Sequence, residues 1–178
     1  MYKRKREHSI NNKSTDVLPL TKSKYLYQKL DYYPYHCAPF ALYNLLLNYG
    51  KHIGLNKLIK LCNPDPLSGT NNEQMDKTIE YLNKKFDVNI KSTEANICNI
   101  KSILESGRKI IILFHWTQDF YKGEHYSMIE KMISPYEFKF VNYSFDKPEK
   151  IVSLRELKNM LRCHTINGDI CPTIWTMM

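Results

Sequence analysis

The sequence has little of what marks membrane, fibrous or disulfide-stabilised proteins. Only 6 of its 178 residues are glycine and 8 are proline, too few for a low-complexity or collagen-like chain. Mean hydropathy is −0.48, and no apolar run approaches the roughly 18 residues of a membrane-spanning helix. The composition therefore predicts one soluble globular domain, a usual unit for this length, with no membrane span.

Cysteine is also scarce, and the five cysteines are an odd number. The N-terminus has charge but lacks the apolar segment of a secretory signal. We therefore expect no signal peptide, free thiols and an intracellular, cytoplasmic protein, with a nuclear or virion-associated location left open. Cys163, His164 and Cys171 lie close together but lack the spacing of tight metal-ligand pairs, so we expect no metal and no cofactor.

The formal net charge of +8 is concentrated at one end of the chain. Residues 1–24 carry +5, and residues 25–178 carry only +3. The first segment is polar and has no hydrophobic period, so we expect a basic, disordered arm at 1–24 and a folded domain at 25–178. We expect nucleic-acid contact, if any, only through Lys3, Arg4, Lys5 and Arg6, and a solvated basic tail is the simpler interpretation.

Hydrophobic periodicity predicts a helix-rich half followed by a mostly antiparallel sheet. Helices are expected at 38–49 (beginning at or near Cys37), 55–61, 71–86 (capped by Thr70 and Glu73), 96–105 and 154–161; strands are expected at 109–116, 125–132 and 137–143, with an edge strand at 172–178. Helices and strands do not alternate as βαβ units. The fold class is therefore α+β.

Two residues in this layout can carry nucleophilic chemistry. Cys37 lies where the first long helix begins, and the free N–H groups and positive dipole end of a helix start favour a thiolate. His125 begins a strand about ninety residues later, where an imidazole can be held against the thiol and take its proton. Each residue alone has a structural explanation, because free cysteines and sheet histidines are commonly buried.

Two further residues can complete a site around this pair. If residues 134–135 form a hairpin, Asn142 returns to the end of the sheet that carries His125, and its carboxamide can accept the imidazole N–H. Asp146 is a rival for that role. Gln28 precedes the nucleophile on the same segment, and its side-chain amide with the Cys37 backbone N–H can stabilise an oxyanion.

The order Gln28, Cys37, His125, Asn142 resembles the papain-like cysteine peptidases, and the spacing is most similar to the compact bacteriocin-leader (double-glycine) processing peptidase domains. The resemblance covers nearly all of residues 25–161. It is carried by Tyr-Gln at 27–28, Cys-Ala-Pro-Phe-Ala-Leu at 37–42, Asn-Tyr-Gly-Lys at 48–51, His-Tyr-Ser-Met at 125–128 and Val-Asn-Tyr-Ser at 141–144. It implies a nucleophile helix packed on a mostly antiparallel sheet.

The resemblance also implies a thiol peptidase that acts on a peptide or protein substrate through an acyl-thioester intermediate. The same residues serve isopeptidases and acyl transferases on related folds, so the acceptor stays open. The alternative is a non-catalytic protein, either an inactive papain-like domain or a basic-tailed accessory factor that binds nucleic acid or protein. The sequence determines neither the natural substrate nor the oligomeric state.

Overall fold

The computed structural model describes residues 25–29, 35–115, 124–144, 146–167 and 173–178, with only the backbone path for 163–167. The predicted arm at 1–24, with Lys3, Arg4, Lys5 and Arg6, lies outside these residues.

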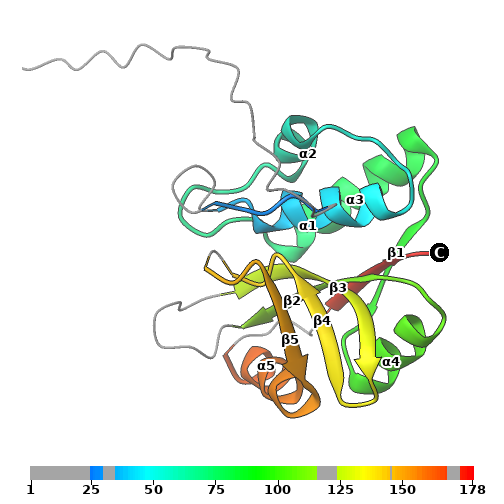
Figure 1. Cartoon of the computed structure of the whole chain (residues 1–178). Helices are drawn as coiled ribbons and strands as arrows, with labels where there is room; N and C mark the ends of the chain where they lie inside the picture. Colours follow the sequence, from blue (N-terminus) through cyan, green and yellow to red (C-terminus); the bar gives the residue numbers. More distant parts are fainter. Residues whose placement is uncertain (1–24, 30–34, 116–123, 145, 168–172) are drawn as a thin grey trace, which may run out of the picture.

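A six-stranded antiparallel sheet runs through the middle of the domain (Figure 1). Its strands are β1 (Ile90–Glu94), β2 (Ile110–His115), β3 (Glu124–Ser134), β4 (Glu137–Val141), β5 (Glu149–Ser153) and β6 (Thr173–Met177). They lie in the order β1-β6-β2-β3-β4-β5, and every neighbouring pair is antiparallel. The expected mostly antiparallel α+β fold is confirmed.

Helices cover both faces of this sheet (Figure 1). They are α1 (Cys37–Asn48), α2 (Leu55–Cys62), α3 (Asn72–Phe86), α4 (Ile97–Glu105) and α5 (Leu154–Asn167). The first three pack on one face with Ile111, Leu113 and Met128, and the last two pack on the other with Ile112 and Phe138. The continuous apolar run of β2 follows from this layering, since both of its faces are buried.

The nucleophile helix predicted from the sequence is α1, which begins at Cys37. Its buried residues are Ala38, Pro39, Phe40, Ala41, Leu42, Asn44, Leu45 and Leu46, because the helix is packed between α2 and β3. Pro39 is tolerated in the first turn, where its missing N–H has no helical partner. The helix ends before Gly50, whose φ of +68° is the left-handed conformation that glycine adopts without strain.

The predicted capping box of α3 is wrong by one residue. The sequence at 70–74 contains two overlapping patterns, and the structure uses the second. Asn71 accepts a hydrogen bond from the Gln74 backbone N–H at 2.8 Å, and the Gln74 side chain accepts one from the Asn71 N–H at 2.8 Å. Thr70, the predicted cap, is instead buried beside the helix start.

The strand predicted at 172–178 is also placed differently from the expectation. It was expected at an edge, but β6 lies between β1 and β2. Its residues explain the difference, because Trp175 and Met177 pack on the α1 side and Ile174 on the α5 side. Strands β1 and β5 were not predicted, and they are the two edges. Helix α5 extends to Asn167 rather than to residue 161.

Among the residues that the structure describes, no helix combines the length and the apolar character needed to cross a bilayer.

Candidate active site

Cys37 is the first residue of α1 and lies where this helix meets β3. The N-cap residue, His36, makes no side-chain capping bond, so the first-turn N–H groups are available to other acceptors. The backbone N–H groups of Tyr126, Ala38 and Cys37 itself lie near the Cys37 sulfur and lower the pKa of its thiol. The residue is partly exposed, and its sulfur therefore lies in a ring of amide donors at the edge of the core.

The protonation state of Cys37 differs from the one expected from its place at a helix start. Burial raises the pKa of the Cys37 thiol, and the three backbone N–H groups offset that rise only in part. The amides do favour the thiolate, as predicted, but desolvation outweighs them. The resting group at neutral pH is therefore a neutral thiol.

His125 is the second residue of β3 and is almost completely buried. Its ring meets the Phe114 ring edge-on, with 5.7 Å between centroids, and its Nε2 lies 2.8 Å from the main-chain oxygen of Asn142. A carbonyl oxygen can only accept, so Nε2 carries the hydrogen and Nδ1 has the lone pair. Burial lowers the pKa of His125 to about 4, and the bond to Asn142 opposes this shift. The imidazole is therefore neutral, with Nδ1 as its basic atom.

Helix α1 packs on β3, and Cys37 lies beside the peptide unit that joins His125 to Tyr126. The Cys37 sulfur contacts the N–H of Tyr126, which is the residue next to His125. Strand alternation turns the Tyr126 side chain into the α1-side core, where it packs against Trp175, and turns His125 toward Phe114. The thiol thus lies against the β3 backbone next to His125, whereas the imidazole lies on the other side of the sheet with Phe114, so the structure does not place these two side chains together.

Asn142 contacts His125 through an atom other than the predicted one. The residue follows β4 with φ +58°, a left-handed conformation that asparagine tolerates better than most residues. We expected its carboxamide to accept the imidazole N–H; the main-chain carbonyl does so instead. The same carbonyl accepts a hydrogen bond from Ser127 Oγ at 2.9 Å. Ser127 was not predicted to take part, although it shares the His125 face of the strand.

The Asn142 carboxamide is directed to Gln28. Its Oδ1 accepts a hydrogen bond from the Gln28 backbone N–H at 3.0 Å, and its Nδ2 lies 3.5 Å from Gln28 Oε1. Gln28 is 3% exposed, so both amides are buried together. The structure therefore brings three of the predicted residues, His125, Asn142 and Gln28, into one connected group.

A polar network that the sequence analysis missed holds the segment before Gln28. The Asn44 side chain, fully buried in α1, accepts from the Leu26 N–H at 2.9 Å and donates to the Leu26 carbonyl at 2.8 Å. The segment then lies across the sheet through hydrogen bonds from Tyr25 to Glu130 and from Tyr27 to Glu149.

Lys139 joins the two carboxylates of this network from β4. Its Nζ lies 2.9 Å from Glu130 and 3.0 Å from Glu149. These ion pairs raise the pKa of Lys139 against the opposing effect of its burial. Because residues 25–28 are fixed on both α1 and the sheet, the backbone that carries Gln28 has a defined position beside Asn142.

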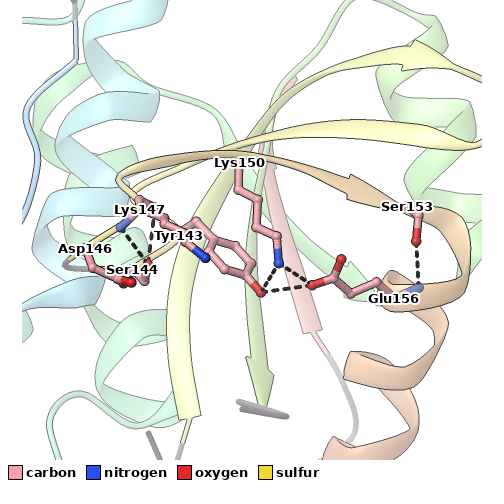
Figure 2. Close-up of polar contacts among 7 residues, drawn as sticks. All are labelled: Tyr143, Ser144, Asp146, Lys147, Lys150, Ser153 and Glu156. Carbon is pink, nitrogen blue, oxygen red and sulfur yellow. Dashed lines mark hydrogen bonds and ion pairs between the residues drawn. The ribbon is translucent and has the colours of Figure 1, made fainter. Parts of the chain in front are cut away.

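The rival residue Asp146 has a different environment (Figure 2). It is exposed, and its carboxylate accepts a hydrogen bond from Ser144 Oγ at 2.7 Å. That bond lowers the pKa of Asp146. Ser144 also accepts from the Lys147 N–H at 2.9 Å, so the three residues form one turn between β4 and β5. The bond to Ser144 gives Asp146 a turn-stabilising role.

Within the described residues, no group of three or more His, Cys, Asp or Glu side chains could hold a metal ion. The Cys163, His164 and Cys171 side chains considered from the sequence lie outside the described side chains.

No protein-family model and no curated protein matches the sequence. Two solved structures resemble the fold. The peptidase domain of Streptococcus ComA, a bi-functional ABC transporter involved in a quorum-sensing pathway, superposes with a TM-score of 0.60 at 12% identity over 81% of this chain and 92% of that one. A double-glycine-motif protease from an AMS/PCAT transporter, solved with the leader peptide, superposes with a TM-score of 0.52 at 13% identity over 80% and 84%. The chain therefore has the papain-like fold of these peptidase domains.

Proposed function

We propose that the chain is a cysteine peptidase whose nucleophile is Cys37. The observation that carries the proposal is the position of the Cys37 sulfur at the start of α1, beside the backbone N–H of Tyr126, the residue that follows His125 on β3. The likeness to two peptidase domains supports the same assignment at the level of the fold. By analogy with the neighbour solved with a leader peptide, the substrate is a peptide segment.

In the proposed reaction, His125 acts as a general base and then as a general acid. The imidazole must first turn from the Phe114 side of the sheet toward the sulfur. Nδ1 then takes the thiol proton as Cys37 Sγ attacks the peptide carbonyl carbon, which forms a C–S bond and a negatively charged oxygen. The Gln28 side chain and the Cys37 backbone N–H hold this oxyanion. His125 returns the proton to the leaving amine as the C–N bond breaks. Water then attacks the thioester, releasing a carboxylic acid and restoring the thiol.

Asn142 has the role of a positioning residue in this scheme. Its carbonyl accepts the Nε2 hydrogen, which keeps the lone pair on Nδ1, and its carboxamide holds the Gln28 backbone. Both contacts of Asn142 are present before the thiol attacks the substrate. In this scheme His125 carries the proton, Asn142 fixes the tautomer of the imidazole, and Gln28 donates a hydrogen bond to the oxyanion.

A peptide library incubated with the full chain tests the proposal by mass spectrometry. We expect new peptide termini with the wild type and at least about a thousandfold less product with Cys37→Ala or His125→Ala. Cys98→Ala, which removes an exposed thiol, is the matched control and should cleave normally. Cleavage that persists in Cys37→Ala would refute the assignment.

The same assay separates hydrolysis from acyl transfer. With an added amine, a transferase gives amide products in place of free acids, whereas a peptidase gives mainly acids. An intact, correctly folded wild type that cleaves nothing would favour the inactive, binding-only alternative.

A further inference from the structure

A second surface feature lies at the far end of the sheet from Cys37. An open pocket of about 610 Å³ is lined by Tyr136, Ser153, Leu154, Arg155, Lys158, Asn159 and Arg162. It lies between the β3–β4 turn and the first three turns of α5. Ser134, beside this turn, is nine positions after His125 on β3, a span of about 30 Å at the rise of an extended strand. The pocket is therefore remote from the candidate active site.

The pocket is strongly cationic for a domain that is nearly neutral. Arg155, Lys158 and Arg162 occur at helical spacing and are exposed on the outer face of α5. Arg155 and Arg162 are seven positions apart, or about 10 Å along the helix. The lining contains no Asp or Glu among the described residues. Three of the positive charges in residues 25–178 are thus gathered in one place.

The one acid in the first turn of α5, Glu156, points toward Lys150 of β5 (Figure 2). Glu156 lies 2.6 Å from Lys150 Nζ and 3.1 Å from the Tyr143 hydroxyl, on the flank of the helix that faces β5. Its backbone N–H donates to Ser153 Oγ, which caps the helix start. The Glu156 charge is therefore compensated by Lys150, and it does not neutralise Arg155 or Lys158.

Backbone hydrogen bonds join the two sides of the pocket, the β3–β4 turn and the start of α5. The Leu154 N–H donates to the Tyr136 carbonyl at 2.7 Å, and Glu137 pairs with Ser153 across β4 and β5. The Tyr136 side chain is 68% exposed, a large apolar surface beside the cations, and Lys101 from α4 lies 5.8 Å from its ring centroid. The pocket thus combines a row of cations with one exposed aromatic ring in a preset arrangement.

We propose that this pocket is a docking site for an acidic peptide segment with an apolar side chain next to its carboxylates. Arginine forks pair with carboxylates in two-point contacts, and a row of about 10 Å matches roughly three residues of an extended peptide. Tyr136 and Leu154 would receive the apolar side chain. A polynucleotide would favour a longer basic surface than a domain of charge +3 provides.

Binding of an acidic peptide in this pocket does not require peptide cleavage at Cys37. A binding measurement therefore tests the docking site. A fluorescently labelled, glutamate-rich peptide with one phenylalanine is titrated with the full chain at physiological salt, both as wild type and as Cys37→Ala. We expect saturable binding of equal strength to the two proteins. Binding by a wild type that cleaves no peptide would reject the proposed function alone, and cleavage by a wild type that does not bind the acidic peptide would reject the docking site alone.

The variants locate the binding. A triple variant, Arg155→Ala, Lys158→Ala and Arg162→Ala, removes three ion pairs with the peptide. Because an exposed ion pair contributes modestly, the loss of all three should weaken binding at least about tenfold. The control removes the same charge elsewhere, at the exposed residues Lys60, Lys84 and Lys85, and should leave binding nearly unchanged. Tyr136→Ala should weaken the phenylalanine-containing peptide more than the same peptide with glycine in its place.

Three results would overturn the proposal. One is the absence of binding to the acidic peptide. Another is an equal loss of binding in the α5 variant and its control, which would indicate a non-specific charge effect. The third is tighter binding of a single-stranded oligonucleotide or of inorganic phosphate that the acidic peptide cannot displace.

Discussion

His125 is buried in a place where its charged form is poorly tolerated. The hydrogen bond to the Asn142 carbonyl opposes the effect of burial on its pKa. The same contact decides which nitrogen carries the hydrogen. A histidine in this state cannot hold a resting imidazolium at neutral pH, so proton transfer from Cys37 belongs to the attack step rather than to the free protein.

The low pKa of His125 predicts a loss of stability in mild acid. The unfolded histidine binds a proton near pH 6.5 and the folded one only near pH 4, so stability is complete above pH 6.5 and falls as the pH drops toward 4. Between pH 7 and pH 5 the free energy of unfolding should fall by about 2 kcal/mol, measured by urea denaturation. His125→Gln should remove this part of the pH dependence, and the surface control His52→Gln should keep it. An unchanged pH dependence in His125→Gln would contradict the burial argument.

The neutral Cys37 thiol predicts slow alkylation. Iodoacetamide reacts with thiolates, so at pH 7 Cys37, whose pKa is raised by burial, should label more slowly than exposed Cys98 in the same molecule. Its labelling should accelerate as the pH rises past 9. Peptide mapping by mass spectrometry measures both rates. Faster labelling of Cys37 at pH 7 would indicate a preformed thiolate and exclude the general-base order of events.

At the scale of elements, local sequence patterns were enough for most of the fold. The apolar period of α1, the continuous run of β2 and the polar–apolar alternation of β3 all predicted the right element. Edge strand β1 was missed because four of its five residues are exposed and its only partner, β6, is more than eighty residues away in sequence. Non-local pairing of this kind leaves no local signal.

The sequence also predicted only those parts of the candidate site that have a local signal. Cys37 and His125 have local signals, a helix start and a strand start. The contact of His125 with the Asn142 carbonyl depends on φ +58° at one residue, which no spacing rule reveals. The two hydrogen bonds of Asn44 to Leu26 were also hidden, because asparagine within a buried helix has no characteristic spacing to its partner.

The segment at 25–28 should depend on Asn44 for its attachment. Asn44→Ala removes both hydrogen bonds to Leu26 and leaves its backbone groups without these partners, which should lower the free energy of unfolding by about 1–3 kcal/mol. Asn56→Ala, on the exposed side of α2, should change it by no more than about 0.5 kcal/mol. Urea denaturation compares the two variants. Equal stability of both would mean that Asn44 does not hold the segment.

At the scale of the whole molecule, the sheet depends on its last strand. β6 joins β1 to the rest of the sheet and supplies buried side chains to both cores, including Trp175, whose indole N–H donates to Asp76 of α3 at 2.8 Å. Strand β6 thus completes the layer that separates α1, α2 and α3 from α4 and α5.

Removal of residues 173–178 should therefore prevent cooperative folding. The deletion exposes apolar groups of β1 and β2 on both sides of the lost strand, and we expect circular dichroism to show no sharp thermal transition. Deletion of Met178 alone, a 57% exposed residue, is the control and should leave a cooperative transition. A truncated chain that still unfolds in one sharp step would contradict a central role for β6.

The central claim is that Cys37 is the nucleophile of a peptidase, and trapping of its acyl intermediate tests it most directly. The wild type is mixed with the cleaved library peptides, quenched in acid and mapped by mass spectrometry. The account predicts an acyl group of the N-terminal product on the peptide that contains Cys37, bound as a thioester that hydroxylamine removes. Cleavage without any such adduct, in a protein where Cys37→Ala remains active, would contradict it.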